Sequence, residues 1–158
     1  MIQTYLYLRK HALMRYSING TNVNKINKIS IVDNDAISNL ISAKTIEKAG
    51  YGTNITTFES AKYALDNMMQ MLFHNPKEFP DLIFLDISMP EMDGLEFLDE
   101  FDKVVQPQSR KCKVVMLSSS VNPDEIKKAK GHRIVYDFVS KPLTINKVEE
   151  IFMNLGQA

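Results

Sequence analysis

Four polar side chains with the potential for chemistry stand at the ends of short apolar runs. Asp33 and Asp86 each follow such a run directly, Ser118 ends a third, and Lys141 stands just beyond a fourth. Two carboxylates that converge repel each other and favour a hard cation between them, and Mg²⁺ prefers oxygen ligands. A cation, a lysine and a hydroxyl beside a carboxylate are the groups that phosphoryl transfer uses, and aspartate can be its nucleophile. The residue types therefore indicate phosphoryl transfer, provided that the chain brings them together.

The elements that must bring these residues together alternate along the chain. Short apolar, β-branched runs predict strands, and apolar residues three and four positions apart predict helices. The predicted strands are 29–32, 54–58, 82–85, 114–117 and 134–139; the predicted helices are 36–49, 61–72, 95–105, one opened by Asn122-Pro123, and 145–155. This alternation predicts an α/β fold with a parallel sheet covered by helices on both faces. Such sheets bind ligands beyond the carboxyl ends of their strands, where the four polar residues fall.

The first predicted helix carries its own local signals. Ile37, Leu40 and Ile41 lie at helical spacing, and Gly50 is a stop signal after the helix. Asp35, directly before the helix, is a residue type that caps helix N-termini.

Several motifs resemble the receiver domains of response regulators in two-component signal transduction. Asp86-Ile-Ser-Met-Pro-Glu-Met-Asp-Gly94 resembles their phosphoacceptor loop, D-x-x-M-P-x-M-D-G, and Phe138-Val-Ser-Lys141-Pro resembles their aromatic-x-x-Lys-Pro signature. Asp33-Asn34 resembles the acidic pair after their first strand, and Ser118-Ser119 resembles the hydroxyl-small pair after their fourth. The resemblance covers residues 28–157 and implies a flavodoxin-like, doubly wound five-stranded parallel sheet of order 2-1-3-4-5 with five helices. Among receivers, the chain looks like the single-domain, chemotaxis-regulator type.

The resemblance implies a role for each site residue. Asp86 would accept a phosphoryl group from the phosphohistidine of a histidine kinase or a histidine phosphotransfer protein. Asp33, Asp86 and the backbone carbonyl of Ser88 would bind Mg²⁺. Lys141 would pair with the phosphoryl group, and Ser118 would donate a hydrogen bond to it. We therefore expect a phosphoacceptor, with slow self-dephosphorylation at most, rather than an enzyme.

The resemblance also implies how the signal leaves the domain. Phe138 would be the switch residue, and the surface formed by residues 122–157 would contact a downstream protein. Because few residues follow Lys141, we expect a stand-alone receiver that signals by protein contact, or carries phosphate within a relay, and does not bind nucleic acid directly.

One position departs from the family pattern. The second residue of the acidic pair, normally a metal ligand, is Asn34. An amide oxygen carries no charge, so Mg²⁺ affinity is expected to fall, because charge count tunes such sites. Asp35 could compensate, or it could simply cap the helix. The sequence leaves open both an active phosphoacceptor and a receiver that works independently of phosphorylation.

A rival reading comes from another class of protein. Mg²⁺-dependent phosphatases also place a D-x-D motif after an apolar first strand, which would make Asp33 the nucleophile and Asp35 the acid. That motif is normally followed by Gly-Thr, whereas Ala36-Ile37 follow here. The receiver interpretation explains more of the motifs in the sequence than the phosphatase interpretation does.

Composition and charge set the broad class. The chain has 158 residues, 44% of them hydrophobic and 24% charged, which is typical of one globular domain. Residues 1–32 contain five basic residues and no acidic ones, whereas the rest carries 14 Lys and Arg against 19 Asp and Glu. This mildly acidic body argues against a nucleic-acid partner. Without a membrane-length apolar stretch or a signal peptide, a cytoplasmic protein is expected.

The first part of the chain looks different from the rest. Residues 1–27 end in a run rich in Asn, Gly, Ser and Thr, which is typical of loops. We expect an N-terminal extension, 1–27, ahead of a receiver domain, 28–157. The extension could be disordered, could form a short added helix, or could be an upstream extension of the reading frame, with Met14 as an alternative start.

Overall fold

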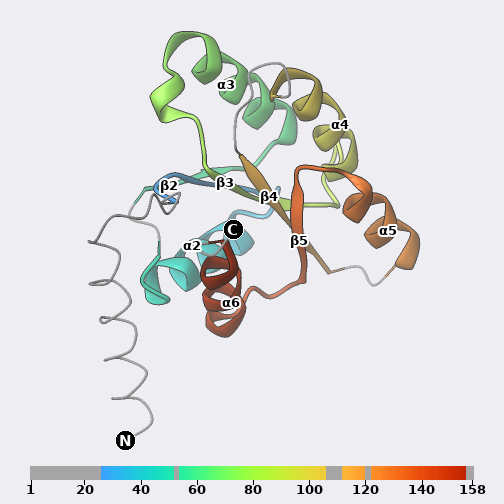
Figure 1. Ribbon diagram of the computed structural model, residues 1–158. Helices are drawn as coiled ribbons and strands as arrows, with labels where there is room; N and C mark the ends of the chain where they lie inside the picture. Colours follow the sequence, from blue (N-terminus) through green and yellow to red (C-terminus); the bar gives the residue numbers. More distant parts are fainter. Residues whose placement is uncertain (1–25, 52–53, 106–111, 120–121, 156–158) are drawn as a thin grey trace, which may run out of the picture.

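The computed structural model describes residues 26–51, 54–105, 112–119 and 122–155, which form a three-layer α/β sandwich (Figure 1). Nearly all of the predicted N-terminal extension lies outside the described residues, so its role stays a prediction. The strands are β1 (Ile29–Val32), β2 (Ile55–Phe58), β3 (Leu82–Asp86), β4 (Lys113–Ser118) and β5 (Val135–Ser140). The helices are α2 (Ala36–Lys48), α3 (Ala61–His74), the short 3₁₀ helix η1 (Pro76–Glu78), α4 (Gly94–Val105), α5 (Pro123–Gly131) and α6 (Ile145–Leu155).

The sheet has the predicted topology. Its five strands run in the order β2-β1-β3-β4-β5, and every neighbouring pair is parallel. The order reverses at β1, whose neighbours are β2 and β3. In open parallel sheets, ligands bind beyond the carboxyl ends of the strands at such a switch point. The flavodoxin-like fold class is therefore confirmed, and the topology marks the end of β1 and β3 as the place to look for chemistry.

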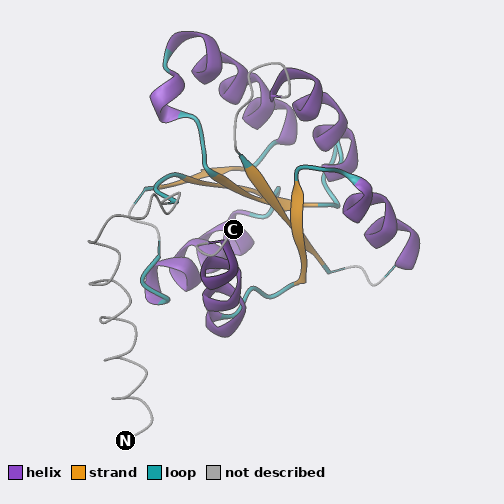
Figure 2. Ribbon diagram, viewed as in Figure 1, coloured by secondary structure: helices purple, strands orange, loops and turns teal. Residues whose placement is uncertain are grey.

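Two hydrophobic cores lie on opposite faces of the sheet. Helices α2 and α6 cover one face, and α3, α4 and α5 cover the other (Figures 1 and 2). Because successive side chains of a strand point to opposite faces, Leu82 and Phe84 enter the α2/α6 core while Ile83 and Leu85 enter the other core. Full burial of both faces explains why the β3 sequence is continuously apolar.

Helix α2 packs with the opposite orientation to the one its apolar spacing suggests. Ile37, Leu40 and Ile41 are 68%, 59% and 50% exposed. The side chains that α2 buries include the polar residues Asn39 and Ser42. The predicted N-cap and stop signal are both present. Asp35 accepts a hydrogen bond from the Ile37 N–H at 2.9 Å, and Gly50 has a φ of 80°, a left-handed conformation that glycine adopts without strain.

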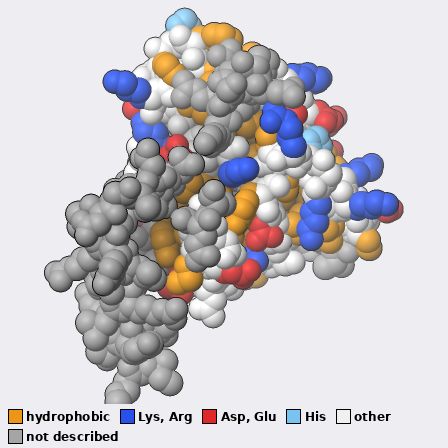
Figure 3. All heavy atoms as spheres, in the orientation of Figure 1, with side chains coloured by type: hydrophobic (Ala, Val, Ile, Leu, Met, Phe, Trp, Pro, Cys, Tyr) orange, Lys and Arg blue, Asp and Glu red, His pale blue; other side chains and the backbone are white. Residues whose placement is uncertain are grey.

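The described surface is mixed in charge. Acidic and basic side chains are interspersed, with hydrophobic side chains between them, over the described part of the face shown in Figure 3. Among the described residues, we find no helix with both the length and the apolar character needed to cross a membrane.

Candidate functional site

The carboxylates of Asp33 and Asp86 meet at the switch point of the sheet. The last residues of β1 pair in register with β3, Val32 opposite Leu85, and the two aspartates come next on each strand. Both side chains are almost completely buried, with 2% and 6% of their surfaces exposed. Burying two carboxylates side by side is costly unless a cation compensates them.

Lys141 supplies that compensation. Its Nζ lies 2.5 Å from Asp33 Oδ2 and 3.1 Å from Asp86 Oδ2, so one ammonium group bridges both carboxylates. The lysine follows β5, and its backbone N–H donates to the carbonyl of Ser118 at 2.9 Å, which fixes it beside the end of β4. Three strand ends thus bring together three of the predicted site residues, separated by as many as 108 positions in the sequence.

The two carboxyl groups differ in acidity. Burial raises the pKa of Asp33, but hydrogen bonds from Lys141, Ser38 and the Asp35 N–H outweigh it and hold this pKa below its ordinary value. Burial raises the pKa of Asp86, and although Lys141 lowers it, the negative charge of Asp33 helps to keep it above the ordinary value. Environments that separate the pKa values of a carboxyl pair suit the two groups to different tasks. Asp33 suits a fixed anion, and Asp86 suits the more basic, nucleophilic group.

Asp33 is held by a set of contacts from the start of α2. The Ser38 hydroxyl donates to Asp33 Oδ2 at 2.6 Å, and the Asp35 N–H donates to Oδ1 at 3.0 Å. Asn39 Nδ2 donates to the Asp33 carbonyl at 2.8 Å. The sequence reasoning missed Ser38 and Asn39, because inward-facing polar residues in a helix leave no periodic signal.

Asp35 caps α2 and is exposed, so it is not a second buried acid beside Asp33. The Asp35 carboxylate therefore serves as a helix cap, one of the two roles that the sequence left open for it.

The loop after β3 is anchored tightly to Asp86. Gly94 begins α4 directly against the backbone of Asp86 and Ile87, and its N–H donates to the Ile87 carbonyl at 2.8 Å. A Cβ at position 94 would lie 2.9 Å from Ile87 Cα and closer still to the Asp86 carbonyl oxygen. Only glycine lets α4 start this close to the end of β3. The close contact with the backbone of Asp86 therefore explains on steric grounds why position 94 is a glycine.

The other predicted site residues lie around this centre. Ser118 is buried at the end of β4, and the backbone of Ser88 acts to lower the pKa of Asp86. Asn34 is exposed beside Asp33. Phe138 lies half-buried on β5 and packs against the core formed with α3, α4 and α5.

The donor atoms at this site are oxygens. Among the described residues, no three His, Cys, Asp or Glu side chains group as a metal site requires, in keeping with Asn34 at the usual second-acid position. Asp33 and Asp86 provide two carboxylates, and Asn34 and the Ser88 carbonyl are neutral oxygens in the same segments. Two carboxylates with neutral oxygens and waters fit Mg²⁺, which seldom takes an all-protein cage.

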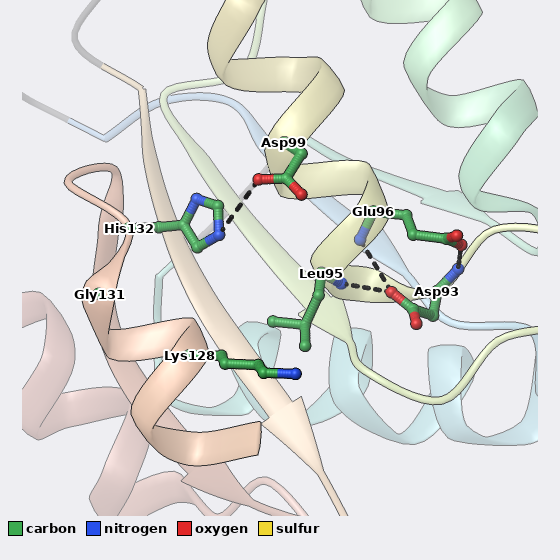
Figure 4. A pocket seen from close by; sticks show the side chains of 7 residues that line it. All are labelled: Asp93, Leu95, Glu96, Asp99, Lys128, Gly131 and His132. Carbon is green, nitrogen blue, oxygen red and sulfur yellow. Dashed lines mark hydrogen bonds and ion pairs between the residues drawn. The ribbon is translucent and has the colours of Figure 1, made fainter. Parts of the chain in front are cut away.

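A hollow of about 620 Å³ between α4 and α5 lies apart from these residues (Figure 4). Asp93, at its edge, caps α4: its Oδ1 accepts from the N–H groups of Leu95 and Glu96, and Glu96 Oε2 accepts from the Asp93 N–H. Across the hollow, His132 Nε2 lies 3.5 Å from Asp99. Asp93 is thus a helix cap, and the hollow contains none of the predicted site residues.

Comparison with known proteins gives a consistent result. The family model of the response regulator receiver domain matches residues 29–152 of this chain. The sporulation initiation phosphotransferase F of Bacillus subtilis is 31% identical over 123 residues, covering 78% of this chain and 88% of that protein. A crystal structure of a two-component response regulator from Cytophaga hutchinsonii superposes with a TM-score of 0.76 at 29% identity, covering 85% of this chain and 99% of the other. The receiver domain of the histidine kinase CKI1 from Arabidopsis thaliana, complexed with Mg²⁺ and BeF₃⁻, has a TM-score of 0.68 at 25% identity, covering 80% and 90%.

Proposed function

Because this chain belongs to the response regulator receiver family of two-component signal transduction, we propose that Asp86 is the aspartate that accepts the phosphoryl group. One observation carries this assignment: Asp86 ends β3 with its carboxylate 3.1 Å from Lys141 Nζ and beside a second buried carboxylate, Asp33. Asp33 is tied down by its own hydrogen bonds, and burial makes Asp86 the more basic of the two. Asp86 is therefore the better nucleophile of the pair.

The proposed transfer is a displacement at phosphorus. An oxygen of Asp86 attacks the phosphorus of a phosphohistidine, an oxygen–phosphorus bond forms, the phosphorus–nitrogen bond breaks, and the nitrogen of the leaving imidazole keeps the electron pair. Lys141 stabilises the negative charge on the transferred group, because its ammonium already faces Asp86. Ser118, at the end of β4, is proposed to donate to one of the phosphoryl oxygens. The product is an acyl phosphate that hydrolyses slowly, with no further turnover.

Mg²⁺ is proposed as the cofactor. Asp33, Asp86 and the Ser88 carbonyl would hold it, with Asn34 as a weaker neutral ligand. The cation would supply charge neutralisation for the incoming phosphoryl group. The Mg²⁺ complex of the related CKI1 receiver supports this proposal for the family.

The phosphodonor is proposed to be a histidine kinase or a histidine phosphotransfer protein that docks on α2. The three exposed apolar side chains of this helix, Ile37, Leu40 and Ile41, start two residues after Asp35 and so lie beside the acceptor edge of the sheet. An exposed apolar group next to a reaction centre is typical of a contact surface. A donor seated there would present its phosphohistidine close to Asp86.

The output surface is proposed to lie within residues 122–157, with Phe138 as its switch. Ile145 and Met153 on α6 are 42% and 47% exposed, so the described part of this region carries apolar groups for a protein partner. The mixed charge of the visible surface supports protein rather than nucleic-acid contact. We further propose that the protein works in the cytoplasm.

A phosphorylation-independent receiver is the second candidate, and Asn34 favours it. With a neutral residue at this position the cation site has lost one carboxylate, and Lys141 alone already bridges Asp33 and Asp86. Such a protein would bind its partner in the unmodified state.

Incubation with acetyl phosphate and Mg²⁺, followed by intact-mass measurement, separates the two candidates. A phosphate adduct on the native protein that is lost in Asp86→Asn supports the phosphoacceptor. Absence of any adduct at saturating Mg²⁺ would leave the phosphorylation-independent receiver as the better account.

A further inference from the structure

Two consecutive residues in the first turn of α2 contact Asp33, one at its side chain and the other at its backbone. Ser38 contacts the carboxylate of Asp33, and Asn39 contacts its backbone carbonyl. Neither residue belongs to the motifs that identify the family. We propose that Ser38 and Asn39 are positioning residues for phosphoryl transfer, which orient Asp33 for the cation; this inference rests on the proposed function.

Asn39 fixes the position of Asp33 in the sheet. Its Nδ2 donates to the Asp33 carbonyl at 2.8 Å and to the Phe58 carbonyl, at the end of β2, at 3.2 Å. One buried amide therefore joins the ends of β1 and β2, where the Asp33 N–H also donates to the Phe58 carbonyl at 3.0 Å. Asn39 Oδ1 is buried without a hydrogen-bond partner among the described residues. A buried, unsatisfied acceptor is unfavourable, so the amide is placed for its two donor contacts.

Ser38 fixes the direction of the carboxylate. Its hydroxyl donates at 2.6 Å to Asp33 Oδ2, the same oxygen that faces Lys141. A hydroxyl is neutral, so it orients the carboxylate without cancelling its charge. Hydrogen-bonding partners of this kind commonly tune metal ligands. Because Asn34 is neutral, Asp33 is the one carboxylate other than Asp86 that the described residues bring to this site, and its orientation weighs correspondingly more.

The orientation of α2 supports a functional reason for these contacts. Turning the helix would bury Ile37, Leu40 and Ile41, but it would expose Ile46, which is fully buried now. It would also carry Ser38 and Asn39 away from Asp33. The helix instead keeps Asn39 and Ser42 inward, together with Ile46.

The test is the Mg²⁺ dependence of phosphorylation by acetyl phosphate in the full-length chain. Ser38→Ala is expected to raise the Mg²⁺ concentration for half-maximal rate about tenfold, while the thermal midpoint stays close to that of the native protein. Ser38→Thr keeps the hydroxyl and is expected to restore the native Mg²⁺ dependence. Ser42→Ala is the matched control and is expected to keep the native Mg²⁺ dependence. Ser42 is also buried on α2 but lies one turn further from Asp33.

Asn39→Ala is expected to shift the Mg²⁺ dependence in the same direction. If this variant fails to fold, Ser38 decides the matter, because its loss leaves the backbone contacts of Asn39 intact. An unchanged Mg²⁺ dependence in Ser38→Ala, or no recovery in Ser38→Thr, would overturn the inference while leaving Asp86 as the acceptor. Absence of phosphorylation in the native protein itself would refute the proposed function, and the positioning role with it.

Discussion

Removal of the Lys141 ammonium is expected to leave two buried carboxylates without their shared countercharge. At the observed 3.1 Å between Lys141 Nζ and Asp86 Oδ2, the attraction at an effective dielectric constant of about 20 is roughly 5 kcal/mol. Part of this gain is offset by the cost of desolvating the ammonium, so Lys141→Met should lower the free energy of unfolding by about 3 kcal/mol. For a domain of this size the thermal midpoint should fall by about 6–12 °C.

Urea unfolding followed by far-ultraviolet circular dichroism measures this change, since the chain has no tryptophan to report by fluorescence. Mg²⁺ should restore part of the lost stability, because a cation that binds only the folded variant replaces the missing charge. Lys103→Met is the control: this lysine pairs with Glu100 on the surface with 67% of its side chain exposed, and its loss should have no measurable effect.

A double-mutant cycle tests whether the carboxylate pair is the cause. Asp33→Asn removes one of the two like charges, so it should destabilise the Lys141→Met background much less than it destabilises the native protein. A coupling energy of about 2–3 kcal/mol is expected for groups in direct contact. Additive effects of the two substitutions would refute the reasoning that Lys141 compensates Asp33 and Asp86 together.

Three further predictions address the loop, the cation and the donor. Gly94→Ala should destabilise the fold by about 2 kcal/mol or more and slow phosphorylation of Asp86, since the new Cβ meets backbone atoms; denaturation and rate measurements check this, and native values for both would contradict it. Asn34→Asp should lower the Mg²⁺ concentration needed for half-maximal phosphorylation about tenfold, because a carboxylate attracts the cation more strongly than an amide; an unchanged titration would show that position 34 does not face the cation. Leu40→Glu should slow transfer from a protein phosphodonor about tenfold or more without changing the rate with acetyl phosphate, whereas Phe73→Glu, at a residue 64% exposed on α3, should change neither rate. Equal loss with both donors would place Leu40 in the chemistry rather than in docking.

The sequence alone predicted the convergence of Asp33, Asp86 and Lys141. Each residue follows a strand, and parallel strands end at the same edge of a sheet, so the order of the elements was enough to bring residues 108 positions apart together. The predicted strands and helices are confirmed as well, because apolar periodicity and turn residues mark them locally.

The contacts that refine the site could not be predicted in the same way. Ser38 and Asn39 are ordinary polar residues in a helix, and the apolar spacing of Ile37, Leu40 and Ile41 indicates the wrong inward face. Which face α2 buries depends on hydrogen bonds to β1 and β2, which are tertiary contacts that no helical period records. The role of Asp35 was left open between cap and ligand, and its hydrogen bond to the Ile37 N–H shows the cap.

The central claim is that Asp86 carries the phosphoryl group, and chemical trapping of the acyl phosphate tests it most directly. The protein is phosphorylated with acetyl phosphate and Mg²⁺, reduced with borohydride, digested, and sequenced by mass spectrometry to find the reduced residue. The modification is expected at position 86, and it is expected to be lost in Asp86→Asn. Modification at Asp33, or modification that persists in Asp86→Asn, would contradict it.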